Sequence, residues 1–444
     1  MSDKKQVFDL CFLGGTAVTP GGPVQADIGV QDGKITYIGR IDPTQAHQSV
    51  ECAGLHIFPG VIDSQVHFRE PGLTHKEDLA HGMRGAIAGG VTSIFEMPNT
   101  DPLTLTKETL NEKLDIASKS AYCNYAFYIG GSAVNIDSLS MLETLPGCCG
   151  VKVFMGASTG DLLTDKDHTL RKIFKSGRRR VAVHAEDQDR LKARYQLFKG
   201  TDDVKMHPTI RDEEAALKAT QRIIKIAKET QRPAHILHIT TDAELDVIAR
   251  HKNLITAEAT PQHLTLFAPE CYEILGTKAQ MNPPIREKTH QAALWRAVNA
   301  GIIDTIGSDH APHTLEEKAK PFPDSPSGMP GVQTLVPVML HHVNKRRLTM
   351  MRALDLMCHA PARVFGLVSK GRLAEGYDAD LTIVDMQAKA EVSNTWIESK
   401  SGWTPFHGMK VTAWPKMTVI NGQISMRDGE ILPPRAGKMA AFLP

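Results

Sequence analysis

Val181-Ala182-Val183-His184 decides the fold, because it shows a pattern that recurs along the middle of the chain. A short apolar run ends there in a polar side chain, and runs of the same kind lie at 92–96, 150–154, 234–238 and 303–307. Segments with helical periodicity separate these runs. Buried strands that alternate with helices predict parallel βα units, so we expect a (β/α)8 barrel of the TIM type, an α/β fold.

The two ends of the chain follow a different pattern. Residues 8–12, 26–30 and 34–38 alternate between apolar and polar side chains, and the same alternation returns at 380–385 and 418–422. Such segments predict short antiparallel strands. We therefore expect three parts: residues 1–58 and 366–444 form one small β-sandwich from both termini, and residues 59–365 form the barrel.

Composition excludes several classes of protein. The 444 residues include 51 basic and 50 acidic residues, a net charge of +1, so no overall field attracts nucleic acid or an anionic membrane. No run of about 20 apolar residues predicts a membrane span. The seven cysteines show no CxxC spacing, which favours a reducing, cytoplasmic location. The basic run 175–180 is either a solvated turn or a patch for a partner.

Five residues have side chains of the kind that bind metals, and each lies in or just after the apolar run of a different predicted strand. In a barrel the carboxyl ends of the strands converge on one face, so these side chains are candidates for one site. Imidazole and carboxylate groups are suitable zinc ligands. The five are His67, Lys152, His184, His238 and Asp309.

Each of the five has an alternative interpretation when it is taken alone. A single strand-end histidine is commonly a hydrogen-bonded structural residue, which is how we interpret His235, His251 and His290. Lys152 could be a strand-face residue with its ammonium group in solvent, since an unpaired buried charge is costly. Asp309 could be a helix cap. The occurrence of all five together favours a metal centre.

The candidate residues belong to a set of motifs that is spread over nearly the whole chain. The motifs are Pro59-Gly60-Val61-Ile62-Asp63, His67-Phe68-Arg69-Glu70-Pro71-Gly72, Met97-Pro98-Asn99-Thr100, Val151-Lys152-Val153-Phe154-Met155-Gly156, His184-Ala185-Glu186, His238-Ile239-Thr240, Asn282-Pro283-Pro284, Ser308-Asp309-His310-Ala311-Pro312-His313 and Gly376-Tyr377-Asp378-Ala379-Asp380-Leu381. No single motif is specific, but together and in this order they resemble the dihydroorotases of the amidohydrolase superfamily.

The resemblance implies two zinc ions that share a hydroxide. Lys152 matches a position where the lysine is carbamylated by carbon dioxide and bridges the metals. His184 and His238 would hold the more exposed metal and His67 the deeper one, and Asp309 would be both a ligand and the catalytic proton shuttle. Two cations would lower the pKa of the bridging water and polarise the amide carbonyl.

Arg69 suggests the class of substrate. A guanidinium near the metals suits a substrate carboxylate, whereas the alternative is a structural ion pair with Glu70 or Asp78. The family match assigns Asn99 and His313 to the same carboxylate. It assigns Asn282 and the backbone at Pro330 and Gly331 to the substrate ring. The loop 314–331 is either a lid or an inert surface loop.

One position departs from the family pattern. Most relatives read Asp-x-His-x-His at the first strand, but this chain reads Asp63-Ser64-Gln65-Val66-His67. An amide is a poorer zinc ligand than imidazole, so the deeper site is weak, uses water or Asp63, or is empty. The number of zinc ions, one or two, is left open.

We therefore predict reversible hydrolysis of dihydroorotate to N-carbamoyl-aspartate, a step of pyrimidine biosynthesis. The alternatives are another cyclic amidohydrolase (a hydantoinase, dihydropyrimidinase or allantoinase) and a catalytically silent dihydroorotase-like partner subunit. The expected partner is the small-molecule substrate. The resemblance also implies a homodimer or homotetramer.

Overall fold

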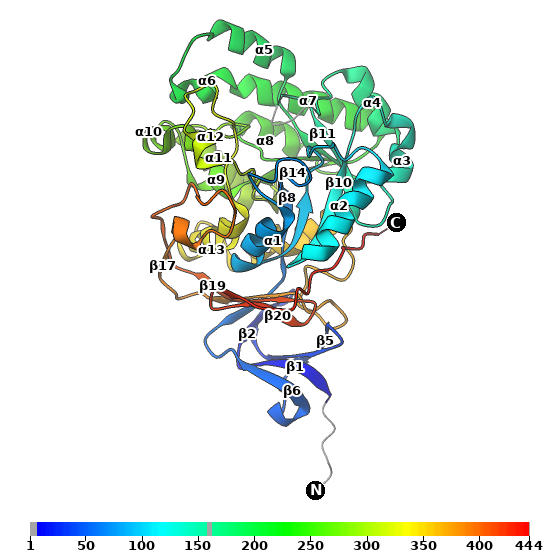
Figure 1. Cartoon of the computed structure of the whole chain (residues 1–444), viewed down its shortest axis with the longest axis vertical. Helices are drawn as coiled ribbons and strands as arrows, with labels where there is room; N and C mark the ends of the chain where they lie inside the picture. The colour runs from blue at the N-terminus through cyan, green and yellow to red at the C-terminus, as the bar shows by residue number, and fades with distance from the viewer. Residues whose placement is uncertain (1–6, 158–161, 444) are drawn as a thin grey trace.

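Eight parallel strands form the centre of the molecule in a computed structural model that describes residues 7–157 and 162–443 (Figure 1). The sheet order is β15-β14-β13-β12-β11-β10-β9-β8, so each strand lies beside the next along the chain. This confirms the barrel. The strands are β8 (Val61–Val66), β9 (Val91–Glu96), β10 (Asn124–Gly130), β11 (Cys148–Phe154), β12 (Val181–His184), β13 (Ala234–Ile236), β14 (Ile255–Ala259) and β15 (Thr305–Ile306).

The barrel closes between its first and last strands through a short parallel bridge. Val66 pairs with His310, and the backbone N–H of His67 donates to the carbonyl oxygen of His310 over 2.7 Å. Closure therefore happens at the level of the expected ligands and not along the whole length of β15, which has only two residues. His67 and Asp309 are brought to adjacent positions by this junction.

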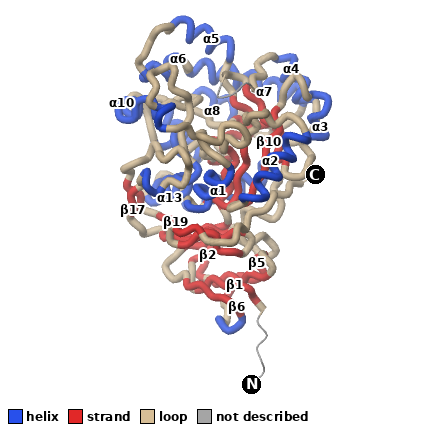
Figure 2. Tube along the Cα trace, viewed as in Figure 1, coloured by secondary structure: helices blue, strands red, loops and turns tan. Residues whose placement is uncertain are grey.

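Helices surround the barrel, as Figure 2 shows for the upper part of the molecule. Aspartates cap α1, α5 and α7 at their N-termini. The Asp78 carboxylate, for example, accepts from the His81 N–H at α1, and Asp212 accepts from the Ala215 N–H at α7. The helices are α1 (Leu79–Ala88), α2 (Lys107–Ser120), α3 (Leu139–Leu142), α4 (Asp167–Lys175), α5 (Gln188–Leu197), α6 (His207–Ile210), α7 (Glu213–Thr230), α8 (Asp242–Ala249), α9 (Pro261–Thr265), α10 (Glu270–Leu275), α11 (Lys288–Asn299), α12 (Leu315–Lys318), α13 (Leu335–Asn344), α14 (Met350–Leu354) and α15 (Ala360–Phe365).

Two further sheets form the small β part below the barrel in Figure 1. One has the order β5-β4-β1-β6 and the other β21-β20-β19-β16-β7-β2-β3. A pair of short strands, β17 (Ala390–Glu391) and β18 (Lys410–Val411), lies apart. The remaining strands are β1 (Phe8–Leu13), β2 (Thr16–Thr19), β3 (Gly22–Gln25), β4 (Asp27–Gln31), β5 (Lys34–Gly39), β6 (Ala46–Glu51), β7 (His56–Pro59), β16 (Leu381–Asp385), β19 (Trp414–Ile420), β20 (Gln423–Arg427) and β21 (Glu430–Ile431).

The larger of these sheets joins the two ends of the chain. β16 pairs antiparallel with β7, with Leu381 opposite Pro59, and apolar side chains of both sheets, such as Phe12 and Ile383, share one buried cluster. A sandwich built from both termini is therefore present. The domain boundaries at 58/59 and 365/366 stay predictions, and residues 1–6 and 444 lie outside the described part of the chain.

Aromatic side chains fill the part of the barrel interior that lies before the carboxyl ends of the strands. The ring of Phe95 packs edge-on against the rings of Phe365 and Phe442, with 5.4 and 5.5 Å between ring centres. The ring centre of Tyr128 lies 6.0 Å from that of Phe365. We call these four residues the aromatic floor. Phe365 ends α15 and Phe442 belongs to the C-terminal segment, so both close the barrel from outside its strands.

The basic run at 175–180 is a solvated turn only in its first part. Arg178 is exposed, but the Arg179 guanidinium donates to the carbonyl oxygens of Glu143 and Cys148 at 2.6 Å. Arg180 donates to the carbonyl oxygens of Ala234 and Leu254. Two of the arginines therefore bind backbone carbonyl oxygens, at the end of α3 and at or just before the starts of three barrel strands.

Within the described residues, no helix combines the length and the apolar character that crossing a membrane requires.

Candidate metal centre

The five expected ligands come from five barrel strands. Lys152 lies within β11 and His184 ends β12, whereas His67, His238 and Asp309 lie just beyond β8, β13 and β15. Two of the last three lie where the chain turns: His238 has φ 38° and Asp309 has φ 45°. These positive angles are uncommon for non-glycine residues and are associated with functional sites.

Four of the five side chains border one cavity of about 350 Å³ in two close pairs. His184 Nδ1 lies 3.1 Å from His238 Nε2, and His67 Nε2 lies 3.3 Å from Asp309 Oδ1. Burial lowers the pKa of all three histidines, so their rings are neutral near pH 7 and keep a lone pair for a metal.

Lys152 lies in the protein interior beside this cavity. Its side chain is fully buried and its Nζ has no hydrogen-bond partner among the described residues, while the ring of Phe154 lies 4.3 Å away. The alternative of a solvent-exposed ammonium group is therefore wrong. Burial lowers the pKa of Lys152 to about 7, so a large share of the side chain is the neutral, nucleophilic amine at physiological pH.

Two further side chains orient the histidines. Glu186 accepts a hydrogen bond from His184 Nε2 over 2.9 Å, and the Arg211 guanidinium beside it holds the pKa of that carboxyl well below its usual range. The side-chain amide oxygen Oδ1 of Asn99 lies 2.8 Å from His67 Nδ1. Each contact places the proton on one ring nitrogen and leaves the other as a lone-pair donor. Glu186 belongs to the motif that begins at His184, but no role could be predicted for it from the sequence.

Gln65 occupies the place of the missing histidine and borders the same cavity. Its Nε2 donates to Asp309 Oδ1 over 3.0 Å, and its buried Oε1 has no hydrogen-bond partner among the described residues. Asp63, the other candidate substitute, does not line the cavity. Its Oδ1 accepts from the backbone N–H groups of Gln65 and Ser308. Of the two, Gln65 is the one placed to offer an oxygen to the site.

Comparisons with known proteins place this arrangement in a family. The sequence profile of the amidohydrolase family matches residues 56–425, which include all five expected ligands. The chain belongs to the amidohydrolase family. A dihydroorotase of Methanothermobacter thermautotrophicus is 34% identical over 414 residues, covering 91% of this chain and 92% of the relative.

Relatives with other activities are nearly as similar. An allantoinase of Deinococcus radiodurans is 32% identical over 447 residues, covering 97% of this chain and 98% of its own. The crystal structure of an L-hydantoinase from Arthrobacter aurescens superposes with a TM-score of 0.93 at 29% identity, covering 98% of this chain and 100% of that one. This amidohydrolase is therefore a cyclic amide hydrolase of a generally metal-dependent family, and its substrate must be argued from the site.

Arg69 lies in the cavity wall, and no carboxylate of the residues that the structure describes contacts its guanidinium. It is 2% exposed, and its described contacts are to the carbonyl oxygen of Pro312 at 3.4 Å and to His313 Nε2 at 3.5 Å. The expected alternative, an ion pair with Glu70 or Asp78, is wrong: Glu70 accepts from the Leu79 N–H and Asp78 caps α1. Burial lowers the pKa of Arg69 to about 10, so it remains charged.

The other expected substrate residues divide into two groups. Asn99 and Asn282 line the cavity with Arg69, but His313, Pro330 and Gly331 do not. His313 lies behind Arg69, fully buried. Pro330 and Gly331 line a neighbouring cavity of about 220 Å³, and the Gly331 N–H donates to His310 Nδ1 over 3.0 Å. Direct contact of these three with a substrate stays a prediction.

The loop 314–331 is fixed to the barrel by buried polar contacts. Lys318 is 1% exposed, and its Nζ donates to the carbonyl oxygens of Gln280 at 3.2 Å and Pro326 at 2.8 Å. Gln280 also donates to the Ser325 carbonyl oxygen. The loop therefore contributes Ser327 and Gly328 to the cavity wall and is not an inert surface loop, while a lid motion stays a prediction.

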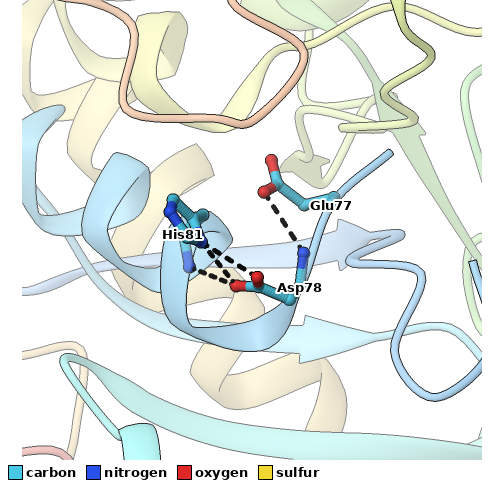
Figure 3. A group of neighbouring side chains, drawn as sticks. All are labelled: Glu77, Asp78 and His81. Atoms are coloured by element: carbon cyan, nitrogen blue, oxygen red, sulfur yellow. Dashed lines mark hydrogen bonds and ion pairs between the residues drawn. The ribbon is translucent and has the colours of Figure 1, made fainter. Parts of the chain in front are cut away.

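Two other groups of side chains within the described residues have metal-like geometry, but both already have protein partners. Figure 3 shows Glu77, Asp78 and His81, where the Asp78 carboxylate accepts from the backbone N–H and the ring of His81. In the second group, Glu213, Glu287 and His290, the imidazole contacts Glu213 at 2.8 Å. His290 is therefore hydrogen-bonded, as expected.

The alternative interpretation of Asp309 as a helix cap is wrong, because the helix that follows it, α12, is capped by Thr314.

Proposed function

We propose that this amidohydrolase is a dihydroorotase, which interconverts dihydroorotate and N-carbamoyl-aspartate in the cytoplasm as a homodimer or homotetramer. The observation that carries the proposal is the buried guanidinium of Arg69 in the cavity wall, which no carboxylate among the described residues contacts. An unpaired buried cation is costly unless a ligand compensates it. Dihydroorotate and N-carbamoyl-aspartate carry such a carboxylate, whereas hydantoin and dihydrouracil do not.

The donor set fits zinc. His67, His184, His238 and Asp309 line one cavity, and the buried Lys152 Nζ and His238 Nδ1 lack hydrogen-bond partners among the described residues. His184 and His238 would hold one ion, and His67 with Asp309 the other, with Gln65 as a weak third donor. When bound, zinc supplies a hydroxide nucleophile at neutral pH and polarises the substrate carbonyl.

Lys152 would complete the centre as a carbamate. The neutral amine attacks the carbon of carbon dioxide, a new N–C bond forms, and the nitrogen releases one proton to water. The product is an anionic carbamate, a carboxylate analogue that can bridge two cations. The buried environment of Lys152 supports this step because it favours the neutral amine.

The residues of the chain would then divide the reaction among them. Arg69 and Asn99 bind the substrate carboxylate and Asn282 binds the ring. Asp309 accepts the proton of the attacking water and returns it to the ring nitrogen as the C–N bond breaks. The hydrogen bond from Gln65 holds the Asp309 carboxylate toward the cavity in this scheme.

The test is turnover in both directions, measured together with metal content. Purified protein should interconvert dihydroorotate and N-carbamoyl-aspartate and lose activity on chelation. Arg69→Met should lose most of its kcat/KM for dihydroorotate, because one charge-assisted bidentate contact contributes about 2–3 kcal/mol. Activity on dihydrouracil, hydantoin or allantoin without activity on dihydroorotate would overturn the substrate and leave the chemistry standing.

The other cyclic amidohydrolases are the second candidate, favoured by the TM-score of 0.93 to the L-hydantoinase and by the similarity to the allantoinase. The silent-subunit alternative makes a separate prediction, because Gln65 removes one of the imidazoles. A protein with almost no bound metal and no activity on any of these substrates would support that alternative.

A further inference from the structure

Lys76 lies beside the proposed carboxylate site, and the mechanism does not use it. It is 8% exposed, and its Nζ lies 3.1 Å from His313 Nδ1 and 3.1 Å from Glu317 Oε1. His313 in turn lies against Arg69. We call Arg69, Lys76, His313 and Glu317 the Lys76 cluster. The side chain of His313 therefore lies between Lys76 and the Arg69 guanidinium that would bind substrate.

Two contacts determine which nitrogen of the His313 ring carries the proton. An ammonium group only donates, so His313 Nδ1 must accept from Lys76. A carbonyl oxygen only accepts, so Nε2, 3.1 Å from the Ser327 oxygen, must be the protonated nitrogen. Burial lowers the pKa of His313 to about 3, so the ring is neutral and has one N–H. Both contacts select the same tautomer.

This tautomer has a consequence for Arg69. Its Nη2 lies 3.5 Å from His313 Nε2, and two N–H donors cannot bond to each other. Nη2 therefore remains available to an acceptor in the cavity. With the proton on Nδ1, Nε2 would instead accept from Arg69, and Glu317 Oε2, 3.6 Å from Nδ1, would stabilise that proton.

We propose that Lys76 is a positioning residue that holds His313 in its Nε2–H tautomer and so keeps the Arg69 guanidinium free for a substrate carboxylate. Lys76 then sets the preference for a carboxylate-bearing ring over its neutral analogue. The proposal rests on the proposed function in that it takes the carboxylate of the substrate to bind at Arg69.

The competing explanation is that Lys76 only anchors the loop 314–331 through its ion pair with Glu317. An anchor would affect all ligands of the cavity equally, since Ser327 and Gly328 of that loop line it. A tautomer effect would act only on ligands that use Arg69. The two explanations differ in the ratio of affinities for a matched pair of ligands.

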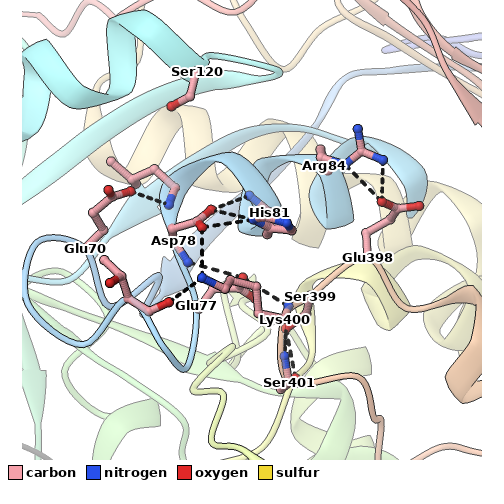
Figure 4. Close-up of polar contacts among 12 residues, drawn as sticks. Glu70, Glu77, Asp78, His81, Arg84, Ser120, Glu398, Ser399, Lys400 and Ser401 are labelled. Atoms are coloured by element: carbon pink, nitrogen blue, oxygen red, sulfur yellow. Dashed lines mark hydrogen bonds and ion pairs between the residues drawn. The ribbon is translucent and has the colours of Figure 1, made fainter.

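The experiment uses orotate and uracil, which differ only in the carboxylate, with binding to the metal-loaded protein measured by calorimetry. Lys76→Met should lower the preference for orotate over uracil about tenfold, equivalent to roughly 1.4 kcal/mol. Lys400→Met is the matched control: Figure 4 shows Lys400 beside Asp78, to whose carboxylate its Nζ donates. The control should change the preference less than twofold.

A second measurement reads the tautomer directly. In protein labelled with ¹⁵N-histidine, the His313 signals are assigned by their loss in His313→Gln. The wild type should show a protonated Nε2, and Lys76→Met should move the proton to Nδ1. A wild-type proton on Nδ1, or an unchanged tautomer in Lys76→Met, overturns the proposal, and so does an equal loss of orotate and uracil binding.

The outcomes also separate this proposal from the proposed function. A wild type that prefers orotate to uracil but does not turn over dihydroorotate would end the proposed function and leave the positioning role of Lys76 intact. A wild type that hydrolyses dihydroorotate, with a preference that Lys76→Met leaves unchanged, would do the reverse.

Discussion

The aromatic floor and the metal centre lie in the same barrel, yet they are built from opposite kinds of side chain. The floor is made of aromatic rings, such as those of Phe95 and Phe365, whose centres lie 5.4 Å apart. The centre holds buried ionisable groups. On β12 the change takes two residues, from Ala182 in the apolar cluster to His184 in the cavity wall. The floor contributes stability through packing, whereas the centre carries groups whose burial costs free energy.

Replacement of Asp309 should have the largest effect on activity, and it tests whether the metal centre can fail while the floor maintains the fold. Asp309→Ala should lower kcat about 10⁴-fold, the upper range for loss of a general acid–base group, while the fold survives because the floor is untouched. Steady-state kinetics and a thermal melt measure the two quantities. Full activity in this variant would exclude Asp309 as the proton shuttle.

Replacement of Lys152 should affect metal content first. Lys152→Ala removes the proposed bridging ligand, so bound metal and rate should both fall, the rate about 10³-fold, since the metal supplies several kcal/mol. A short carboxylic acid should restore part of both. Lys225→Ala, an exposed lysine on α7, is the control. A fully metallated, active enzyme whose intact mass shows an unmodified Lys152 would contradict the carbamate.

Replacement of Phe365 tests the floor. Phe365→Ala should lower the free energy of unfolding by about 3–5 kcal/mol, because it removes a buried ring and leaves a cavity. Denaturant titration measures this. At a temperature where the variant is folded, kcat should stay within about twofold of wild type. A large loss of kcat with little loss of stability would mean that the two ends of the barrel are not independent.

Replacement of Lys318 should have the smallest effect and depends on pH. Burial lowers the pKa of Lys318 to about 7, below its unfolded value, so the unfolded chain binds the extra proton between pH 7 and about 10.5. Wild-type stability should therefore gain from this group as pH rises through that window. Lys318→Met should lack about 2 kcal/mol of that rise. Melts at pH 7 and pH 9.5 compare the slopes.

The features that could be predicted from the sequence are those that depend on the residue pattern of one strand alone. His184 could be identified because it closes an apolar run of its own strand. β10 and β14 were not among the predicted strands. β14 contains Thr256 and Glu258, which interrupt its apolar run, whereas β10 has a continuous apolar run at 125–129 and was missed although its pattern is that of a strand. Buried polar residues inside strands are exceptions that pattern reading treats as loops.

Contacts between distant segments could not be predicted in the same way. Gln65 was correctly singled out as a departure, but its hydrogen bond to Asp309 spans 244 residues. Lys76 carried no signal at all, because its contact with His313 depends on how two loops meet at the barrel mouth. Residue type and spacing indicate candidate ligands, and the orientation of those side chains depends on tertiary structure.

The pairing of β7 with β16 has a consequence for the order of synthesis. β7 pairs with β2 on one side, but Pro59 and Leu381 are opposite each other on the other side, so more than three hundred further residues must be made before this second neighbour exists. At about 5–20 residues per second, this delay is on the order of 15–60 s on the ribosome. During that time the N-terminal strands have an unprotected edge, and the finished barrel must emerge before the small sandwich can be sealed.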